Sequence, residues 1–257
     1  MKIQFYKYHG CGNDFILIDN RTLGLKLSPI QINKLCHRRF GIGSDGIILI
    51  QNEKGYDYHM LFYNPDGSQS FCGNGSRCAL HFSHELGIVK DGSSFLAIDG
   101  QHEGRLNGLH TSIHMSDVNE IEVGADYYYL NTGSPHYVKF VDDVDEINMF
   151  KEGQKIRYND RFREVGTNVN YVEISDDKIK SRVYERGVEN ETYSSGTGTT
   201  AVALCTHLHA NLNQNEIDIV TKGGGLSVSF EKTGPESFEN IWLNGPVTPV
   251  FQGVFEL

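Results

Sequence analysis

The second half of this sequence repeats the pattern of the first at a nearly constant distance. The segment SFCGNGSRCAL (70–80) matches YSSGTGTTAVA (193–203), which places Cys72 and Ser195 in register 123 positions apart. The same spacing relates GCGNDFILID (10–19) to GSPHYVKFVD (133–142), GSDG (43–46) to GTNV (166–169), and DGQHEG (99–104) to KGGGLS (222–227). Four matches in one order indicate two homologous halves, near 1–117 and 118–244.

Each half combines short strands rich in β-branched and aromatic residues with few helices. One helix is expected near 28–38, because Ser28 can cap it and Pro29 suits its first position. Two helices follow Cys72 and Ser195, and a weaker one is expected near 142–152. The strands are expected at FILID, GIILI, YHMLFYN, YVKFVD, NYVEIS and SRVYE.

This order of elements predicts an α/β (α+β) fold of two pseudo-symmetric halves. Each half is expected to be a mixed, mainly antiparallel sheet wrapped around a central helix. A doubly wound parallel sheet fits less well, since it needs a crossover helix after nearly every strand. The alternating tail 245–257 is expected to add a strand that completes the first half.

Composition restricts the class of partner. The net charge is −10, and Lys and Arg form no run, which disfavours nucleic acid and anionic membranes and favours a small polar substrate. The start of the chain does not resemble a signal peptide, and no apolar run is long enough to span a membrane. Five cysteines without a CxxC pair predict reduced thiols and a cytoplasmic protein.

The paired glycine loops have a chemical consequence. Each lies where a helix begins, so unpaired N–H groups and the positive dipole end make it a candidate anion site. If an internal twofold axis relates the loops, they can hold one carboxylate from both sides. A thiol such as Cys72 at a helix N-terminus can have its pKa lowered from ~8.5 to roughly 3.5–7.5, which makes it a usable base.

Three other interpretations compete with this one. A cysteine in a glycine-rich turn is more often structural than catalytic. GTGTTA (196–201) fits a weak dinucleotide-binding pattern, but the polar segment before it is no buried strand. Cys72, Cys78, His81 and His84 suggest a metal site, yet the two histidines follow a helical period and zinc spacing is missing.

Seven segments resemble the diaminopimelate epimerase family in order and spacing, over nearly the whole chain. They are KYHGCGNDFILID, RRFGIGSDG, YNPDGSQSFCGNGSRCA, NTGSPHYV, GTNVNYV, YERGVENET and SSGTGTTA. The resemblance implies a cofactor-independent epimerase of lysine and peptidoglycan biosynthesis. It also implies two pseudo-symmetric halves with the active site in the cleft between them.

The resemblance assigns roles to particular residues. Two cysteines of the family act as thiolate base and thiol acid, and Cys72 stands at the first of these positions. His136 and Glu185 are expected to orient or polarise the catalytic groups. The resemblance also implies that the reacting carboxylate is bound by the backbone N–H groups of Gly73, Asn74, Gly196 and Thr197. It implies that the remaining polar groups of the substrate are bound by the side chains of Asn13, Asn64, Asn168, Glu185 and Arg186.

Ser195 departs from the family, because it occupies the position of the second catalytic cysteine. A hydroxyl is a far weaker acid than a thiol, so its conjugate base is scarce at neutral pH. If general acid–base catalysis contributes ~10²–10⁴-fold, the loss of one partner costs roughly 3–5 kcal/mol of transition-state stabilisation. An engineered replacement, a naturally slow enzyme and a serine that acts only as a proton donor all fit the sequence.

The expected function is therefore interconversion of LL- and meso-diaminopimelate without a cofactor or metal, weakened by Ser195. The expected partner is the small-molecule substrate, and a homodimer is compatible with the sequence. One alternative is a racemase or dehydratase for another amino acid, which catalytic turnover of that substrate would reveal. The other is a binding protein without activity.

Overall fold

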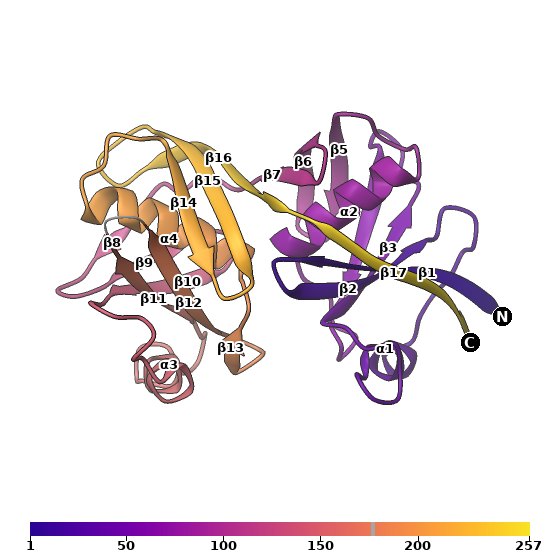
Figure 1. The fold of residues 1–257 in the computed structure, drawn as a ribbon, viewed down its shortest axis with the longest axis horizontal. Helices are drawn as coiled ribbons and strands as arrows, with labels where there is room; N and C mark the ends of the chain where they lie inside the picture. The colour runs from indigo at the N-terminus through magenta and orange to yellow at the C-terminus, as the bar shows by residue number, and fades with distance from the viewer. Residues whose placement is uncertain (176–177) are drawn as a thin grey trace. The chain divides into compact units, whose positions relative to one another are not determined.

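The computed structural model describes residues 1–175 and 178–257, which form two compact units. Unit 1 comprises residues 1–113 and 245–257, and unit 2 comprises residues 114–244 (Figure 1).

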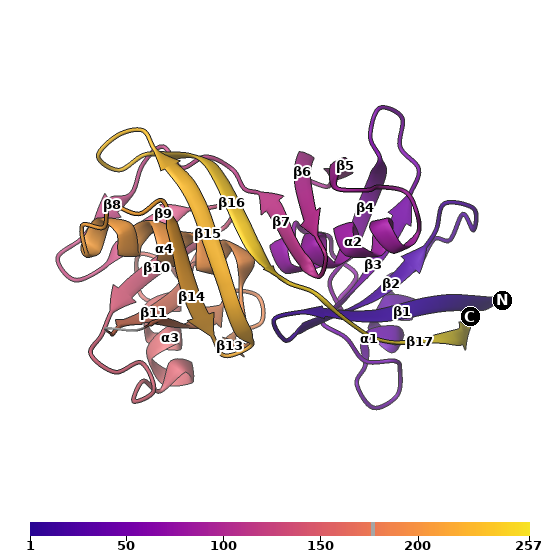
Figure 2. The same ribbon diagram turned by 45° about the horizontal axis from the view of Figure 1, so that its top comes forward.

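Unit 1 begins with a hairpin and ends with a strand from the far end of the chain. Its elements are β1 (Lys2–Gly10), β2 (Asn13–Asp19), α1 (Pro29–Cys36), β3 (Gly46–Gln51), β4 (Tyr58–Tyr63), α2 (Gly73–Glu85), β5 (Gly92–Ala97), β6 (Gly100–Asn107), β7 (His110–His114) and β17 (Thr248–Glu256). The C-terminal strand β17 lies antiparallel along β1, from Lys2 opposite Glu256 to His9 opposite Thr248 (Figure 2).

Unit 2 follows the same order, with two short strands added. Its elements are β8 (Glu122–Val123), β9 (Tyr128–Asn131), β10 (Pro135–Phe140), α3 (Met149–Arg157), β11 (Asn168–Ile174), β12 (Ile179–Glu185), β13 (Asn190–Thr192), α4 (Gly196–His209), β14 (Glu216–Thr221), β15 (Gly224–Lys232) and β16 (Phe238–Pro246).

The parallel strand pairs recur at corresponding places in the two units. In unit 1, β2 pairs in parallel with β3 across α1, and β4 with β5 across α2. In unit 2, β10 pairs in parallel with β11 across α3, and β12 with β14 across α4. The strand pairs without a helix between them are antiparallel, as in β3–β4 and β11–β12. The predicted fold class, a mixed and mainly antiparallel sheet in each half, is confirmed.

One helix is central in each unit. Helix α2 packs against β1, β2, β3, β4 and β6 (Figure 1). Its residues 73–83 are all buried. Helix α4 packs against strands β9 to β12, β14 and β15 in the same way, and it is buried over most of its length. The enclosed helix α2 buries polar side chains as well, namely Asn74, Ser76, Arg77, His81 and Ser83. The glycines at its start also let its backbone lie close to the strands.

The other two helices cover the outer side of their sheets. Helix α1 begins at Pro29 as predicted, and Ser28 and Gln31 form a capping box at its N-terminus. Helix α3 begins at Met149, so the prediction of a helix near 142–152 is wrong in position. Asn148 caps this helix through a hydrogen bond from the Lys151 backbone N–H, and residues 142–148 form a connection instead.

Candidate active site

Cys72 and Ser195 occupy the same structural position in their units. Each is the N-cap residue of the central helix and has an extended backbone, with φ −138° and ψ 109° at Cys72 and φ −126° and ψ 124° at Ser195. The side chain of each accepts the backbone N–H three residues later, at 3.4 Å from Gly75 to Cys72 Sγ and 3.2 Å from Gly198 to Ser195 Oγ. The duplication in the sequence therefore aligns a thiol with a hydroxyl at equivalent helix starts.

The first N–H groups of α2 and α4 belong to Gly73 and Asn74, and to Gly196 and Thr197. The first four N–H groups of an α-helix have no intrahelical partner, and the helix dipole adds positive potential at this end. An anion such as a carboxylate is stabilised in that position. The structure thus places the four predicted backbone donors in pairs, one pair beside Cys72 and one beside Ser195.

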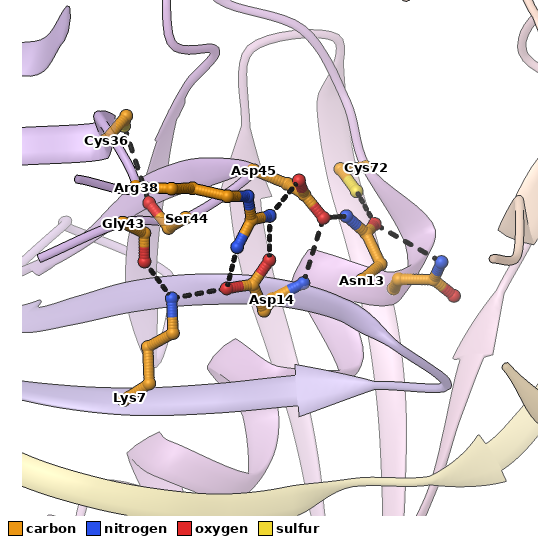
Figure 3. Close-up of polar contacts among 10 residues, drawn as sticks. Lys7, Asn13, Asp14, Cys36, Arg38, Gly43, Ser44, Asp45 and Cys72 are labelled. Carbon is orange, nitrogen blue, oxygen red and sulfur yellow. Dashed lines mark hydrogen bonds and ion pairs between the residues drawn. The ribbon is translucent and has the colours of Figure 1, made fainter. Parts of the chain in front are cut away.

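In unit 1, the amide of Asn13 lies against the Cys72 thiol. A tight turn brings it there, because Cys11 and Gly12 both have positive φ (51° and 82°) between β1 and β2. Asn13 Oδ1 is 3.7 Å from Cys72 Sγ and accepts Asn74 Nδ2 at 3.3 Å. Asn13 Nδ2 donates to Asp45 Oδ2 at 2.8 Å (Figure 3). Asn13, which was predicted to bind substrate, is therefore also a neighbour of the candidate base.

Behind Asn13, charged side chains form a network that the sequence did not reveal. Arg38 bridges Asp14 and Asp45, at 2.6 Å from an oxygen of each, and Lys7 contacts Asp14 and the carbonyl of Gly43 (Figure 3). Burial opposes ionisation of Asp14, but hydrogen bonds from Arg38 and Lys7 outweigh it and lower its pKa to about 2. Burial raises the pKa of Asp45. The two cations hold both carboxylates in place.

In unit 2, His136 is completely buried and its tautomer can be assigned. Asn170 Nδ2 donates to the carbonyl of Tyr137 at 3.0 Å and to His136 Nδ1 at 3.1 Å. Because a carbonyl can only accept, the amide orientation is fixed, and His136 Nδ1 must be the acceptor nitrogen. Nε2 therefore carries the proton and donates it to Thr197 Oγ1 at 2.9 Å.

His136 is neutral at physiological pH. Burial lowers its pKa to about 3, and the positive charge of Arg186 adds to this effect. Thr197 Oγ1 in turn lies 3.4 Å from Ser195 Oγ. The structure therefore connects His136 to the N-cap hydroxyl through Thr197.

Asn168 and Arg186 come together on the same side of unit 2. Asn168 Oδ1 accepts the backbone N–H of Arg186 at 2.8 Å, and its Nδ2 donates to Ser134 Oγ at 2.9 Å. The Arg186 guanidinium donates to the carbonyl of Val165 at 2.9 Å and lies 3.5 Å from Ser134 Oγ. The Arg186 guanidinium and the Asn168 amide therefore lie close together, and this arrangement suits the binding of a carboxylate.

The two remaining predicted residues end strands. Asn64 follows β4, and its amide donates to Ser68 and Ser70 within its own turn. Glu185 is the last residue of β12 and is paired in the sheet with Asn190, next to Arg186 in the chain.

Within residues 1–175 and 178–257, no group of three or more His, Cys, Asp or Glu side chains is arranged to hold a metal ion. None of the helices in those same ranges has the length and apolar character needed to cross a membrane.

Comparison with solved structures identifies the fold. A Bacillus anthracis phenazine biosynthesis protein of the PhzF family superimposes with a TM-score of 0.78 at 14% identity, over 100% of both chains. A hydroxyproline epimerase from Agrobacterium vitis gives a TM-score of 0.71 at 11% identity, over 100% of this chain and 93% of that one. At such low identity these matches establish the fold alone.

Comparison of sequences is more specific. A family model described as diaminopimelate epimerase matches residues 5–101 and 128–248. The diaminopimelate epimerase of Flavobacterium psychrophilum is 46% identical, over 97% of this chain and 99% of that protein. The one from Chlorobaculum tepidum is 38% identical, over 96% of this chain and 99% of that protein. Because the match extends over almost the entire length of each relative, the chain belongs to the diaminopimelate epimerase family, whose members are isomerases.

Proposed function

We propose that this chain is a diaminopimelate epimerase that interconverts LL-2,6-diaminopimelate and meso-diaminopimelate by proton transfer at the α-carbon. One observation carries the proposal: Cys72 and Ser195 cap equivalent helices with matching backbone and hydrogen-bond geometry. Each side chain stands beside a pair of helix N–H groups suited to a carboxylate. Family membership supports the same reaction over a racemase or dehydratase for another amino acid.

The reacting carboxylate is held in this proposal by the N–H groups of Gly73, Asn74, Gly196 and Thr197. These donors neutralise negative charge that develops on the carboxylate when the α-proton leaves. The proposal requires that both helix starts reach the same substrate molecule. Side chains hold the other polar groups of the substrate: Asn13, Asn64, Asn168, Glu185 and Arg186.

Cys72 is the thiolate base in this proposal, and Ser195 is the proton donor on the opposite face. Ser195 Oγ already accepts the Gly198 N–H, so its own proton can point away from the helix toward a substrate. Reversal of the reaction requires Ser195 to act as a base, and a hydroxyl does this poorly at neutral pH. The enzyme is therefore expected to turn over slowly in both directions.

The reaction is proposed to need no cofactor, because the thiol, the hydroxyl and the helix N–H groups supply the acid, the base and the charge stabilisation. We also propose a cytoplasmic location. The five cysteines within the described part of the chain are free thiols, as expected for a reducing compartment.

The test is solvent deuterium incorporation at the α-carbon of diaminopimelate, together with stereoisomer analysis of the product. Ser195→Cys is expected to raise the epimerisation rate roughly 10²–10⁴-fold, because a thiol can both give and take the proton. Cys72→Ala is expected to abolish exchange in either background and serves as the matched control.

Two results would contradict the proposal. Absence of epimerisation after Ser195→Cys, with tight diaminopimelate binding by calorimetry, would indicate a binding protein. Turnover of a proline-type substrate, with none of diaminopimelate, would indicate a different enzyme on the same scaffold.

A further inference from the structure

A directed chain of hydrogen bonds passes beside Cys72 from a buried cation to a carboxylate. Arg77 Nη2 donates to Asn74 Oδ1 at 2.6 Å, and Asn74 Nδ2 donates to Asn13 Oδ1 at 3.3 Å. Asn13 Nδ2 donates to Asp45 Oδ2 at 2.8 Å (Figure 3). Two amides thus connect a guanidinium in α2 to the carboxylate that precedes β3.

The two charged ends fix the direction of this chain. Arg77 is 0% exposed, and a guanidinium can only donate hydrogen bonds. An ionised carboxylate such as Asp45 can only accept them. If the amide of Asn13 were reversed, its Nδ2 would face the Nδ2 of Asn74 and its Oδ1 would face Asp45. Both contacts would be repulsive, so the Asn13 carbonyl must point toward Cys72.

That orientation places the Cys72 sulfur between two opposing contacts. The Gly75 N–H at 3.4 Å stabilises the thiolate, whereas Asn13 Oδ1 at 3.7 Å can accept a proton from the thiol and is repelled by the thiolate. A group that must both take and return a proton needs a pKa near the working pH. The Asn13 carbonyl therefore acts against the helix terminus and favours the thiol form of Cys72.

We propose that Asp45 is a positioning residue for Cys72, acting through Asn13 to keep the thiol form accessible. Asp45 is itself held, because its Oδ1 accepts from Arg38 at 2.6 Å and its Oδ2 accepts the Asp14 backbone N–H at 3.2 Å. The inference rests on the proposed role of Cys72, but it concerns the titration of the free enzyme.

The duplication offers an internal comparison. The residues of unit 2 that correspond to Asn13 and Asp45 are His136 and Asn168. Asn168 Nδ2 lies 3.4 Å from His136 Nε2, and no carboxylate occupies that position. The contact between Asn13 and the Asp45 carboxylate is thus found in unit 1, which carries Cys72, and has no carboxylate counterpart in unit 2.

Several titratable and charged groups surround this part of unit 1 and must be allowed for in any pH experiment. They are Lys7, Asp14, Arg38 and Asp45 on the side of Asn13, and Cys11, Arg77 and Cys78 on the side of α2.

The experiment measures the pH dependence of iodoacetamide alkylation at Cys72 in the full chain without substrate. Mass spectrometry locates the label, and Cys72→Ala provides the blank. The other four thiols are buried. Asp45→Ala is expected to lower the midpoint pH by about 0.5–1 unit, the worth of one hydrogen bond to the thiol form. Asp45→Asn is expected to stay near the wild-type midpoint, because it keeps an acceptor for Asn13.

A double-mutant cycle with Asn13 tests the route and remains informative if Asp45→Ala does not fold. Asn13→Ala alone is expected to lower the midpoint by a similar amount, and Asp45→Ala is expected to add no further shift to it. An unchanged midpoint in Asn13→Ala would overturn the proposal. So would equal shifts in Asp45→Asn and Asp45→Ala, since loss of charge would then be the cause. None of these outcomes depends on whether the chain epimerises diaminopimelate.

Discussion

His136 Nε2 donates to Thr197 Oγ1 at 2.9 Å, so the buried histidine reaches the start of α4 through a threonine hydroxyl. Thr197 Oγ1 then lies 3.4 Å from Ser195 Oγ. A neutral histidine whose pKa is lowered to about 3 by burial does not take up a proton at physiological pH. We propose that His136 orients the Thr197 hydroxyl, and through it the N-cap side chain.

Removal of the Thr197 hydroxyl is expected to weaken catalysis. Thr197→Val keeps the shape of the side chain but leaves the buried His136 N–H without an acceptor. We expect a loss of roughly 10-fold in kcat/KM for diaminopimelate, corresponding to about 1.4 kcal/mol. The measurement is epimerisation kinetics in the Ser195→Cys background, where the rate is high enough to compare variants.

Thr197→Ser is the matched control, because it retains the hydroxyl and is expected to stay within about 3-fold of the parent. A loss in Thr197→Ser with none in Thr197→Val would show that the methyl group, and not the hydrogen bond, matters at this position.

Local signals in the sequence were enough to predict the central helices and their caps. The glycines after Cys72 and Ser195, followed by apolar runs, indicate a helix start, and both residues are N-caps in the structure. The same reasoning places α3 too early in the chain. The helix begins only after Asn148, which is its N-cap residue. Cap positions depend on residue types close together in the chain, so a local sequence pattern is enough to predict them.

The hydrogen-bond chain around Cys72 could not be predicted in the same way. Arg77 and Asp45 both lie in conspicuous motifs, but their effect depends on which way two asparagine amides point. That orientation is set by partners 32 and 61 residues away in the sequence, Asp45 for Asn13 and Asn13 for Asn74. Asn170 was missed for a similar reason, since only its contact with the Tyr137 carbonyl fixes the tautomer of His136.

Burial of neutral His136 predicts a pH-dependent stability of unit 2. Its folded pKa is about 3, against an ordinary value of 6.5, so between these values only the unfolded chain binds a proton. The free energy of unfolding should therefore fall as the pH is lowered from 7 toward 3. Between pH 7 and pH 5 this group alone contributes a loss of about 2 kcal/mol.

Guanidinium denaturation followed by fluorescence measures this effect, because the only tryptophan of the chain, Trp242, is buried in unit 2. His136→Asn is the comparison, since asparagine occupies the corresponding place in unit 1. The variant is expected to be less stable at pH 7. Its free energy of unfolding is expected to fall less than that of the parent as the pH is lowered, because the contribution of His136 is absent. His81 and His207, whose pKa values are also lowered by burial, contribute equally to both proteins. Parallel pH profiles would contradict the assignment.

The equivalent helix glycines Gly75 and Gly198 should respond differently to alanine. A Cβ on Gly198 would lie 2.8 Å from Asn170 Oδ1 and 3.0 Å from Ser195 Cβ, whereas a Cβ on Gly75 would first meet the terminal methyl group of Ile48 at 3.3 Å. Alanine also gains up to about 1 kcal/mol of helix propensity at each site. Gly75→Ala is therefore expected to be nearly neutral, and Gly198→Ala to destabilise by about 1–3 kcal/mol through displacement of Asn170. Thermal unfolding of the two variants makes the comparison, and equal melting temperatures would show that Asn170 moves freely and does not fix His136.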